Sequence, residues 1–228
     1  MIELLNIVYD HNDFVIFVKP PGLSFHSEDG PGFVVKAEQQ LQTKLFSVHR
    51  LDKVTSGLII LAKNKVAAAK FTELFTTNSQ NEKQIEKFYI ALSAQKPKKK
   101  QGWIKGDMAK SRRGAFKLLN SNTNPAVTRF YSYSVKPGIR AFLLKPYTGK
   151  THQLRVALKS LGSPILGDAL YACKEQTDRV YLHAFALRFK WNSETIQLIN
   201  WPEQGEHYVS NEFKMLNQHL SQPWNLDW

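Results

Sequence analysis

Residues 47–64, SVHRLDKVTSGLIILAKN, place a carboxylate at Asp52 shortly before a run of apolar residues. The run is short for a helix and too apolar for an exposed strand, so it predicts a buried core strand. Arg50 and Asp52 point to the same face of an extended segment, and residues 55–57 predict a tight turn. Because a carboxylate partly removed from water must be paired, bound or used, Asp52 belongs either to a structural ion pair or to a functional site.

The composition is that of a folded, basic protein. The chain has 228 residues, of which 43% are hydrophobic, enough to bury a full core in one domain. Lysine and arginine together number 31 and aspartate and glutamate 19, which gives a formal net charge of +12. This excess favours a polyanionic partner, and RNA, DNA and an anionic membrane all fit the charge.

Several classes of protein are excluded by what the sequence lacks. The single cysteine, Cys173, forms no internal disulfide and no multi-cysteine zinc site, and we find no signal peptide or membrane-spanning stretch. We also find no phosphate-binding loop, nucleophile elbow or helical histidine pair. We therefore expect a cytoplasmic protein with no cofactor and no metal, folded as one domain over residues 1–228.

The pattern of apolar residues predicts strands and helices without strict alternation. Strands are expected around the polar break at residues 10–13, over 56–64, and over 86–94 and 180–189. Helices are expected over residues 34–45, over 65–75 after a cap at Asn64, and over 149–162, with Thr151 as its N-cap and Gly162 as its stop. This arrangement predicts the α+β class, with a mainly antiparallel mixed sheet flanked by helices.

The densest positive charge lies in residues 96–117, KPKKKQGWIKGDMAKSRRGAFK. One interpretation is a solvated loop between strands. The alternative is a nucleic-acid surface, in which cations neutralise phosphates and aromatic side chains stack on bases. We favour the second interpretation, because Trp103 and Phe116 are interleaved with nine cations: Lys96, Lys98, Lys99, Lys100, Lys105, Lys110, Arg112, Arg113 and Lys117.

The string HRLDKVTSGLIILAK strongly resembles the H-R-L-D-x-x-T-S-G-L-L-x-x-A-K signature of the RluA-type pseudouridine synthases. Further segments resemble that family in the same order over about residues 10–190: VKPPGLSFHS (18–27), EKFYIAL (86–92), GKTHQLRVAL (149–158), SPILGDALY (163–171) and LHAFALRF (182–189). The K-P-x-G segment begins at Lys19, so we expect no small S4-type domain of the kind that many relatives carry. Residues 203–228 form a C-terminal extension beyond the matching part.

The resemblance implies an isomerase that converts uridine in structured RNA, ribosomal or transfer, to pseudouridine in a central active-site cleft. It implies that Asp52 is the catalytic aspartate, that Tyr89 packs on the target base, and that Arg155 pairs with Asp52. Leu182 is expected to close the apolar side of the pocket. We further expect the uridine to be flipped out of its stack, with Arg50 stacking in the vacated space.

The remaining RNA contacts are expected from the K-x-Y segment and from the basic segment. These substrate-binding residues are Lys87, Trp103, Lys98, Lys99, Lys100, Arg112 and Arg113. We expect a monomer that binds neither membrane nor metal. Two other classes stay open: an inactive RNA-binding or RNA-chaperone protein on the same fold, and a basic DNA-binding regulator, although the sequence has no helix-turn-helix or zinc signature. His152 and His183 fit either structural or catalytic roles.

Overall fold

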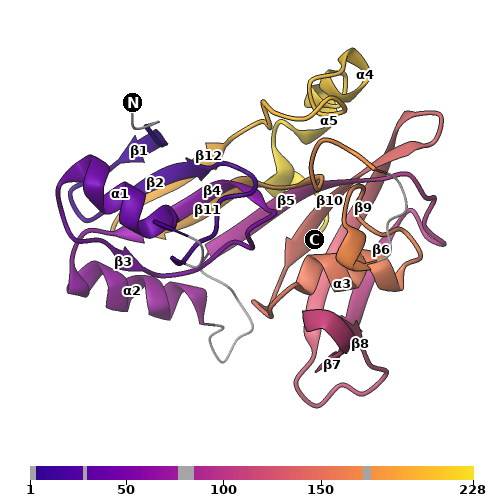
Figure 1. The fold of residues 1–228 in the computed structure, drawn as a ribbon, viewed down its shortest axis with the longest axis horizontal. Helices are drawn as coiled ribbons and strands as arrows, with labels where there is room; N and C mark the ends of the chain where they lie inside the picture. The colour runs from indigo at the N-terminus through magenta and orange to yellow at the C-terminus, as the bar shows by residue number, and fades with distance from the viewer. Residues whose placement is uncertain (1–3, 28–29, 77–84, 172–175) are drawn as a thin grey trace. The chain divides into compact units, whose positions relative to one another are not determined.

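The computed structural model describes residues 4–27, 30–76, 85–171 and 176–228 (Figure 1), so Cys173 lies outside the described residues. The chain divides into two compact units, and each is described by itself. Unit 1 consists of Met1–Glu86 and Ala184–Asn200. Unit 2 consists of Lys87–His183 and Trp201–Trp228.

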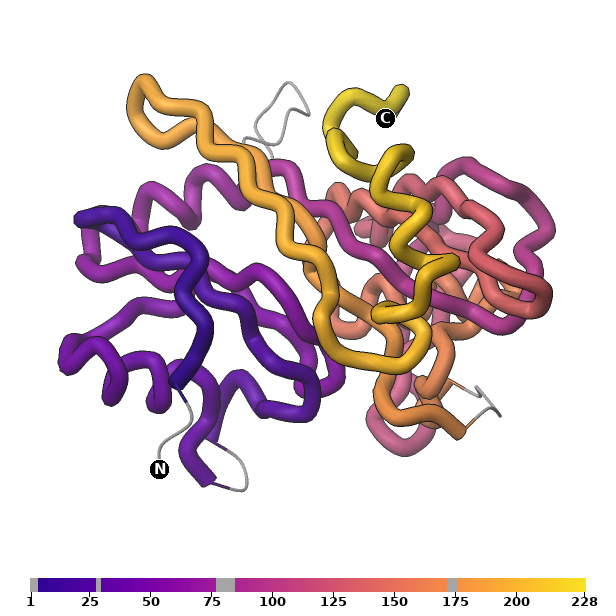
Figure 2. The backbone as a smooth tube through the Cα atoms, turned by 90° about the horizontal axis from the view of Figure 1, so that it is seen from above, coloured from indigo at the N-terminus to yellow at the C-terminus, as the bar shows by residue number. Residues whose placement is uncertain are grey.

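The described residues of unit 1 form two helices and a set of strands that pair mainly antiparallel. Its strands follow the order β1-β2-β4-β11, with β3 paired to β4 and β12 paired to β11. In Figure 2, β11 and β12 run side by side as an orange hairpin. The elements are β1 (Asn6–Asp10), β2 (Phe14–Lys19), α1 (Phe33–Leu41), β3 (Phe46–Ser47), β4 (Ser56–Ala62), α2 (Lys65–Phe75), β11 (Leu182–Trp191, which begins in unit 2) and β12 (Glu194–Ile199).

The core of unit 1 forms around β4. All seven residues of β4 are buried, which confirms the core strand predicted from the apolar run. Phe14 of β2, Phe71 of α2 and Trp191 of β11 pack against one another and against Ile60 in one apolar cluster. The predicted cap of α2 is also confirmed, because the Oδ1 atom of Asn64 accepts a hydrogen bond from the backbone N–H of Ala67 at 2.8 Å.

Two local predictions in unit 1 were wrong. The first helix ends at Leu41 rather than at residue 45, because Gln42 adopts a left-handed conformation and returns its N–H to the carbonyl of Glu38. The tight turn spans residues 52–55 rather than 55–57: the N–H of Thr55 donates to the carbonyl of Asp52 at 3.0 Å. Gly57 instead belongs to β4, where a Cβ atom would lie 2.3 Å from the carbonyl oxygen of Ala184, so only glycine allows β11 to approach.

Unit 2 contains the strands β5-β10-β9-β6 in that order, each paired antiparallel with its neighbour, and a separate two-stranded ribbon of β7 and β8. The α+β class with a mainly antiparallel sheet is thereby confirmed. The elements are β5 (Ile85–Ser93, which begins in unit 1), β6 (Gln101–Gly106), β7 (Met108–Lys110), η1 (Arg112–Gly114), β8 (Phe116–Leu118), β9 (Ala126–Lys136), β10 (Ile139–Pro146), α3 (Gln153–Ser160), η2 (Ala169–Tyr171), α4 (Asn211–Lys214), α5 (Asn217–Leu220) and η3 (Pro223–Asn225).

The start of α3 differs from the prediction. Its N-cap is His152, with φ at 56°, and not Thr151. The side chain of Gln153 accounts for the shift, because its Oε1 atom accepts hydrogen bonds from Lys150 N–H and from the hydroxyl of Thr148. The end agrees with the prediction: the helix stops at Ser160, and Gly162 follows with a positive φ of 74°.

The sheet of unit 2 has two covered faces. Tyr89 lies opposite Leu144 on the first face, which α3 covers: the Nε2 atom of Gln153 donates to the hydroxyl of Thr128 at 3.0 Å. We call this the α3 face. Phe88 lies on the other face, because successive side chains of a strand point to opposite sides. Trp228 of the C-terminal extension packs on Phe88 with ring centroids 5.3 Å apart, so we call this second face the tail face.

Candidate active site

Three contacts within unit 1 hold the backbone on either side of Asp52 in place. Before it, the Nε2 atom of His49 accepts a hydrogen bond from the backbone N–H of Ile60 in β4, at 2.9 Å, and Leu51 is buried. After it, the bond from Thr55 N–H to the Asp52 carbonyl closes the turn that leads into β4. The half-buried side chain of Asp52 therefore projects from a segment with little freedom to move.

Lys19 ties this turn to the K-P-x-G loop. Its side chain is fully buried, and its ammonium donates to the carbonyls of Pro20 at 2.9 Å, Leu23 at 2.8 Å and Lys53 at 3.2 Å. A buried cation is tolerated when its N–H donors are satisfied. Here the hydrogen bonds of the ammonium join the K-P-x-G loop to the turn that follows Asp52. Sequence reasoning missed this role of Lys19, although its place in a motif before two prolines was the available clue.

Tyr89 and Lys87 lie on the α3 face of unit 2, two residues apart on β5. Tyr89 is only 8% exposed, so its ring sits among packed neighbours rather than in solvent. Burial lowers the pKa of Lys87 from its usual 10.5 to about 8. A lysine in this state is partly neutral near pH 8, and it loses its positive charge more easily than a surface lysine.

Arg155 forms a buried ion pair with Asp168, which the sequence did not predict. Its Nε atom donates to Oδ2 at 2.7 Å and its Nη2 atom donates to Oδ1 at 2.9 Å, while the two side chains are 6% and 1% exposed. The guanidinium also lies 5.0 Å from the ring centroid of Tyr171. The hydroxyl of Tyr171 in turn contacts Nδ1 of His152 at 2.9 Å and accepts the N–H of Phe116 at 3.1 Å. Arg155 is thus held rigidly, in a cluster that reaches β8.

Backbone hydrogen bonds join the end of β5 to the residues next to Leu182 and to the segment that contains Asp168. The N–H of Leu92 donates to the carbonyl of Tyr181, the N–H of Leu166 donates to the carbonyl of Leu92, and the N–H of Tyr181 donates to the carbonyl of Leu166. Leu182 itself is buried. His183 is buried as well, with its ring 6.3 Å from that of Tyr208.

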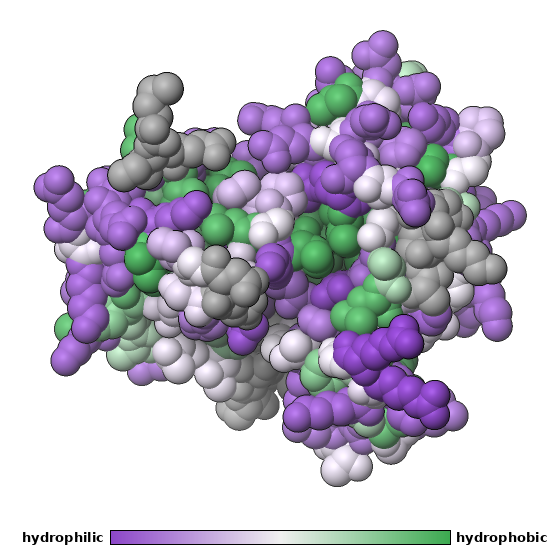
Figure 3. All heavy atoms as spheres, viewed as in Figure 1, coloured by the Kyte–Doolittle hydropathy of each residue, from purple (hydrophilic) through white to green (hydrophobic). Residues whose placement is uncertain are grey.

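The basic segment, residues 96–117, does not form the single solvated loop of the first interpretation. Its middle is strand β6, with Lys98, Lys99 and Lys100 exposed before it, and with Arg112 and Arg113 exposed beyond it at the tip of the β7–β8 ribbon. A six-residue strand spans about 20 Å, so these two groups of cations form separate patches. Figure 3 shows strongly hydrophilic side chains gathered over the β7–β8 ribbon.

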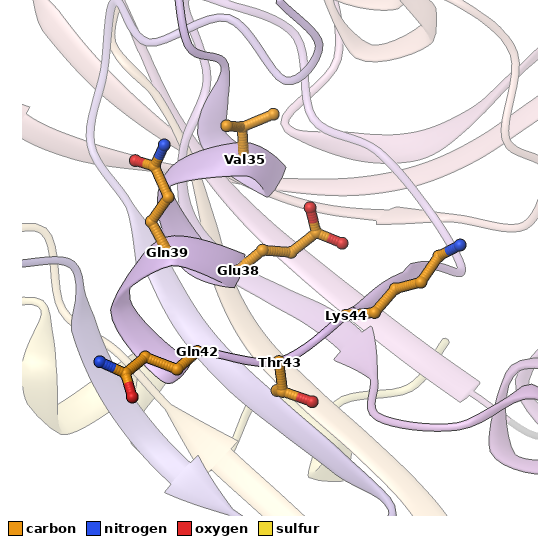
Figure 4. Close-up of a pocket in the computed structure, with 6 residues that line it drawn as sticks. All are labelled: Val35, Glu38, Gln39, Gln42, Thr43 and Lys44. Carbon is orange, nitrogen blue, oxygen red and sulfur yellow. The ribbon is translucent and has the colours of Figure 1, made fainter.

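A surface pocket of about 510 Å³ lies elsewhere, at the C-terminal end of α1 (Figure 4). Its lining comes from α1 and the residues directly after it: Val35, Glu38, Gln39, Gln42, Thr43 and Lys44. None of the site residues predicted from the sequence lines this pocket. Those residues divide between the units: Arg50 and Asp52 belong to unit 1, and Lys87, Tyr89, Arg155 and Leu182 belong to unit 2.

The sequence model of the RNA pseudouridylate synthase family matches residues 13–160. The chain belongs to this family, in its RluA-type branch, and it is therefore an isomerase that acts on RNA.

Individual relatives agree with this assignment. An uncharacterized RNA pseudouridine synthase of Haemophilus influenzae is 50% identical over 224 residues, which cover 96% of this chain and 98% of that protein. Ribosomal large subunit pseudouridine synthase C of Rickettsia bellii is 33% identical over 175 residues, which cover 72% of this chain and 56% of that protein. The solved structure of human RNA pseudouridylate synthase domain containing 1 has a TM-score of 0.72 and 26% identity, covering 89% of this chain and 85% of that one.

Two further findings concern only the part of the chain that the structure describes. No helix there is long and apolar enough to cross a membrane. No group of three or more histidine, cysteine, aspartate or glutamate side chains there is arranged to hold a metal ion.

Proposed function

We propose that the chain converts specific uridines in ribosomal or transfer RNA to pseudouridine, with Asp52 as its catalytic carboxylate. In this reaction the N1–C1′ glycosidic bond breaks, the uracil turns, and C5 bonds to C1′, so that no atom is gained or lost overall. The observation that carries the proposal is the anchoring of the backbone on both sides of Asp52 by His49, Leu51 and Lys19, in a chain of this family. Such anchoring is what a carboxylate needs to meet a substrate in a fixed geometry.

Asp52 has two chemical routes, and both require its ionised form. The carboxylate can attack C1′ as a nucleophile, or it can remove the proton on C2′ as a general base. A site that excludes water strengthens either interaction with the reacting atoms. We propose Arg155 as the cation that pairs with this carboxylate.

The pair with Asp168 suits Arg155 to that role. A guanidinium has five N–H donors, and the two bonds to Asp168 use one on Nε and one on Nη2. The other three can serve a second carboxylate while Asp168 fixes the plane of the group. Asp168 is therefore a positioning residue in this proposal, since it acts through Arg155.

Tyr89 is proposed to hold the detached uracil while the base turns. Its ring is flat and amphipathic, and its hydroxyl is a candidate for the late proton transfer at C5. Leu182 supplies an apolar wall. A uridine within a stem must first be flipped out, and the exposed side chain of Arg50 is suited to stack in the space it leaves.

Release of tritium from RNA that carries 5-tritiated uridine tests the catalytic assignment, because the C5 proton is lost in the isomerisation. Asp52→Asn should abolish release and keep RNA binding, since an amide neither attacks C1′ nor accepts the C2′ proton usefully. Asp10→Asn, an exposed change in the same unit, is the matched control. Near-normal release by Asp52→Asn would remove Asp52 from the chemistry and make it a structural residue.

The competing proposal is an inactive RNA-binding or RNA-chaperone protein on this fold. It predicts RNA binding without tritium release by the unmodified protein on total RNA from a deletion strain. Mapping of pseudouridine in ribosomal and transfer RNA from that strain identifies the target. A uridine that remains unmodified in the deletion strain, and that the pure protein modifies, supports the enzyme.

A further inference from the structure

We infer that the tail face of unit 2 carries a second RNA contact, a binding site for a single-stranded segment. The inference deepens the proposed function, because it assumes that RNA is the substrate. The site consists of Trp103, Arg129, Tyr131, Lys145 and Tyr147, which we call the aromatic–basic row. Its members come from β6, β9, β10 and the residue that follows β10.

Strand register places the row on one face of the sheet. Arg129 of β9 lies opposite Trp103 of β6 and, on its other side, opposite Lys145 of β10. Directly opposed residues of an antiparallel pair point to the same face, and Tyr131 joins them because it is two residues from Arg129. Lys145 lies one residue along from Leu144, the partner of Tyr89. The row therefore lies on the opposite face of the sheet from Tyr89.

The side chains of the row alternate cations with aromatic rings. The guanidinium of Arg129 lies 5.1 Å from the ring centroid of Trp103 and 5.9 Å from that of Tyr131. The ammonium of Lys145 lies 5.4 Å from the ring centroid of Tyr147, whose ring is 5.1 Å from that of Trp103. Trp103 is 53% exposed, so its ring is accessible for stacking.

These features match the chemistry of single-stranded RNA. Such strands bind where aromatic rings stack on bases and nearby cations meet the phosphates. Stacking on Trp103 needs no base pairing and no particular sequence. The net charge of +12 on the chain favours a polyanion over an acidic or neutral peptide.

The end of the chain already occupies part of the row, and its chemistry shows what the row accepts. Asp227 places its carboxylate 3.4 Å from Arg129, and its backbone carbonyl accepts the hydroxyl of Tyr131. Trp228 packs against Tyr131 with ring centroids 5.2 Å apart, and the ammonium of Lys145 lies 5.5 Å from its ring. An anion on the arginine and a flat ring beside it are what a phosphate and a base would supply.

The ion pair between Asp227 and Arg129 is weak. The Asp227 side chain is 97% exposed, and exposed ion pairs at such a distance contribute little, because water and salt screen them. A phosphate can therefore displace the carboxylate from Arg129. RNA and the tail then compete for the row, and a change that weakens the tail should strengthen RNA binding.

An end-labelled oligocytidylate is the probe, because it offers phosphates and stacking faces but no uridine for the catalytic site. Fluorescence anisotropy with the full chain should give about tenfold weaker binding for Trp103→Ala and near-normal binding for Trp103→Phe. Arg129→Gln should lower the slope of log K against log salt by about 0.7, the value for one phosphate on a single strand. Asp227→Asn should bind about two- to fivefold more tightly. Met215→Ala, an exposed apolar change directly after α4, is the matched control and should bind normally.

Equal affinity of Trp103→Ala and the unmodified protein would overturn the inference, as would a failure of the unmodified protein to bind the probe. If the chain instead binds a peptide with the sequence of residues 223–228 and not the probe, the row is a peptide site and the inference falls. Tritium release, measured in parallel, judges the proposed function separately. If the unmodified protein releases tritium and Trp103→Ala binds the probe normally, only the inference about the row is rejected. If the unmodified protein releases no tritium and Trp103→Ala binds the probe more weakly, only the proposed function is rejected.

Discussion

Arg155 and Asp168 are joined by two nearly parallel hydrogen bonds in the interior of unit 2, where neither side chain is exposed by more than 6%. The two-pronged geometry fixes both the position and the plane of the guanidinium. Thirteen residues separate the partners, and α3 carries one while a loop before η2 carries the other. The guanidinium of Arg155 therefore reaches its position only when the loop that carries Asp168 packs against α3.

Asp168→Asn tests this positioning role. The amide keeps the shape of the side chain but removes the charge, and a buried cation without its partner typically costs about 3–5 kcal/mol. We expect a lower free energy of unfolding by urea, and a fall in kcat that exceeds any change in KM. Glu203→Gln, an exposed change in the same unit, is the control and should alter neither. A normal kcat in Asp168→Asn would show that Arg155 needs no positioning.

A double variant separates the structural and catalytic roles of Arg155. Arg155→Ala alone leaves Asp168 buried without its cation, so loss of activity would partly report misfolding. Replacing both partners by apolar residues of similar size is often neutral for stability. We expect Arg155→Met with Asp168→Leu to unfold near the midpoint of the unmodified protein, yet to release no tritium.

Arg155→Lys should recover only part of the activity, because an ammonium lacks the planar fork that matches a carboxylate. The measurements are urea unfolding and single-turnover tritium release at saturating RNA. Activity in the stable double variant would exclude a catalytic role for Arg155.

Lys19 should prove essential for the geometry around Asp52. Lys19→Met keeps the length of the side chain but removes the donor to the carbonyls of Pro20 and Leu23, while the carbonyl of Lys53 keeps the N–H of Gly22. Each carbonyl left unsatisfied costs about 1–3 kcal/mol. We expect lower stability and a lower kcat at unchanged RNA affinity. Lys65→Met, an exposed change at the start of α2, is the control. Normal turnover in Lys19→Met would mean that the turn is held without it.

The sequence predicted the parts of the fold that local patterns specify, such as β4 from its apolar run and the cap of α2 from Asn64. It placed the N-terminus of α3 wrongly, because the side chain of Gln153 binds the N–H of Lys150 and the hydroxyl of Thr148 before the helix and the helix starts only after His152. It did not foresee the Arg155–Asp168 pair, since no periodicity links a helix to a loop thirteen residues away. The position of Trp103 relative to Tyr89 also required strand register, which apolar patterns alone do not fix.

Lys87 should make stability depend on pH. Burial lowers its pKa from 10.5 in the unfolded chain to about 8 in the fold, so the unfolded state binds more protons between these values. Stability contributed by this group therefore rises as the pH increases from about 8 to 10.5, and below pH 8 its charge destabilises the fold by up to about 3 kcal/mol. Lys87→Met should be more stable at pH 7 and lose this rise.

Urea unfolding of both proteins across that range measures the difference, and other titrating groups cancel in the comparison. Parallel curves for the two proteins would contradict the lowered pKa. Because Lys87 is also proposed to contact RNA, its share of RNA affinity should decline as the pH rises through about 8 and beyond in the unmodified protein. Lys190→Met, an exposed change in unit 1, should show neither effect.

The two basic patches at the ends of β6 should contribute independently to RNA binding. Removing one cation that binds a phosphate lowers the slope of log K against log salt by about 0.7 to 0.9. We expect one variant with glutamine at Lys98, Lys99 and Lys100, and another with glutamine at Arg112 and Arg113, each to lower the slope. Because one patch precedes β6 and the other lies at the tip of the β7–β8 ribbon, the slope of the combined variant should fall by the sum of the two changes. Titrations of structured ribosomal RNA at several salt concentrations measure the slopes, and an unchanged slope in either variant would show that RNA does not reach that end of the strand.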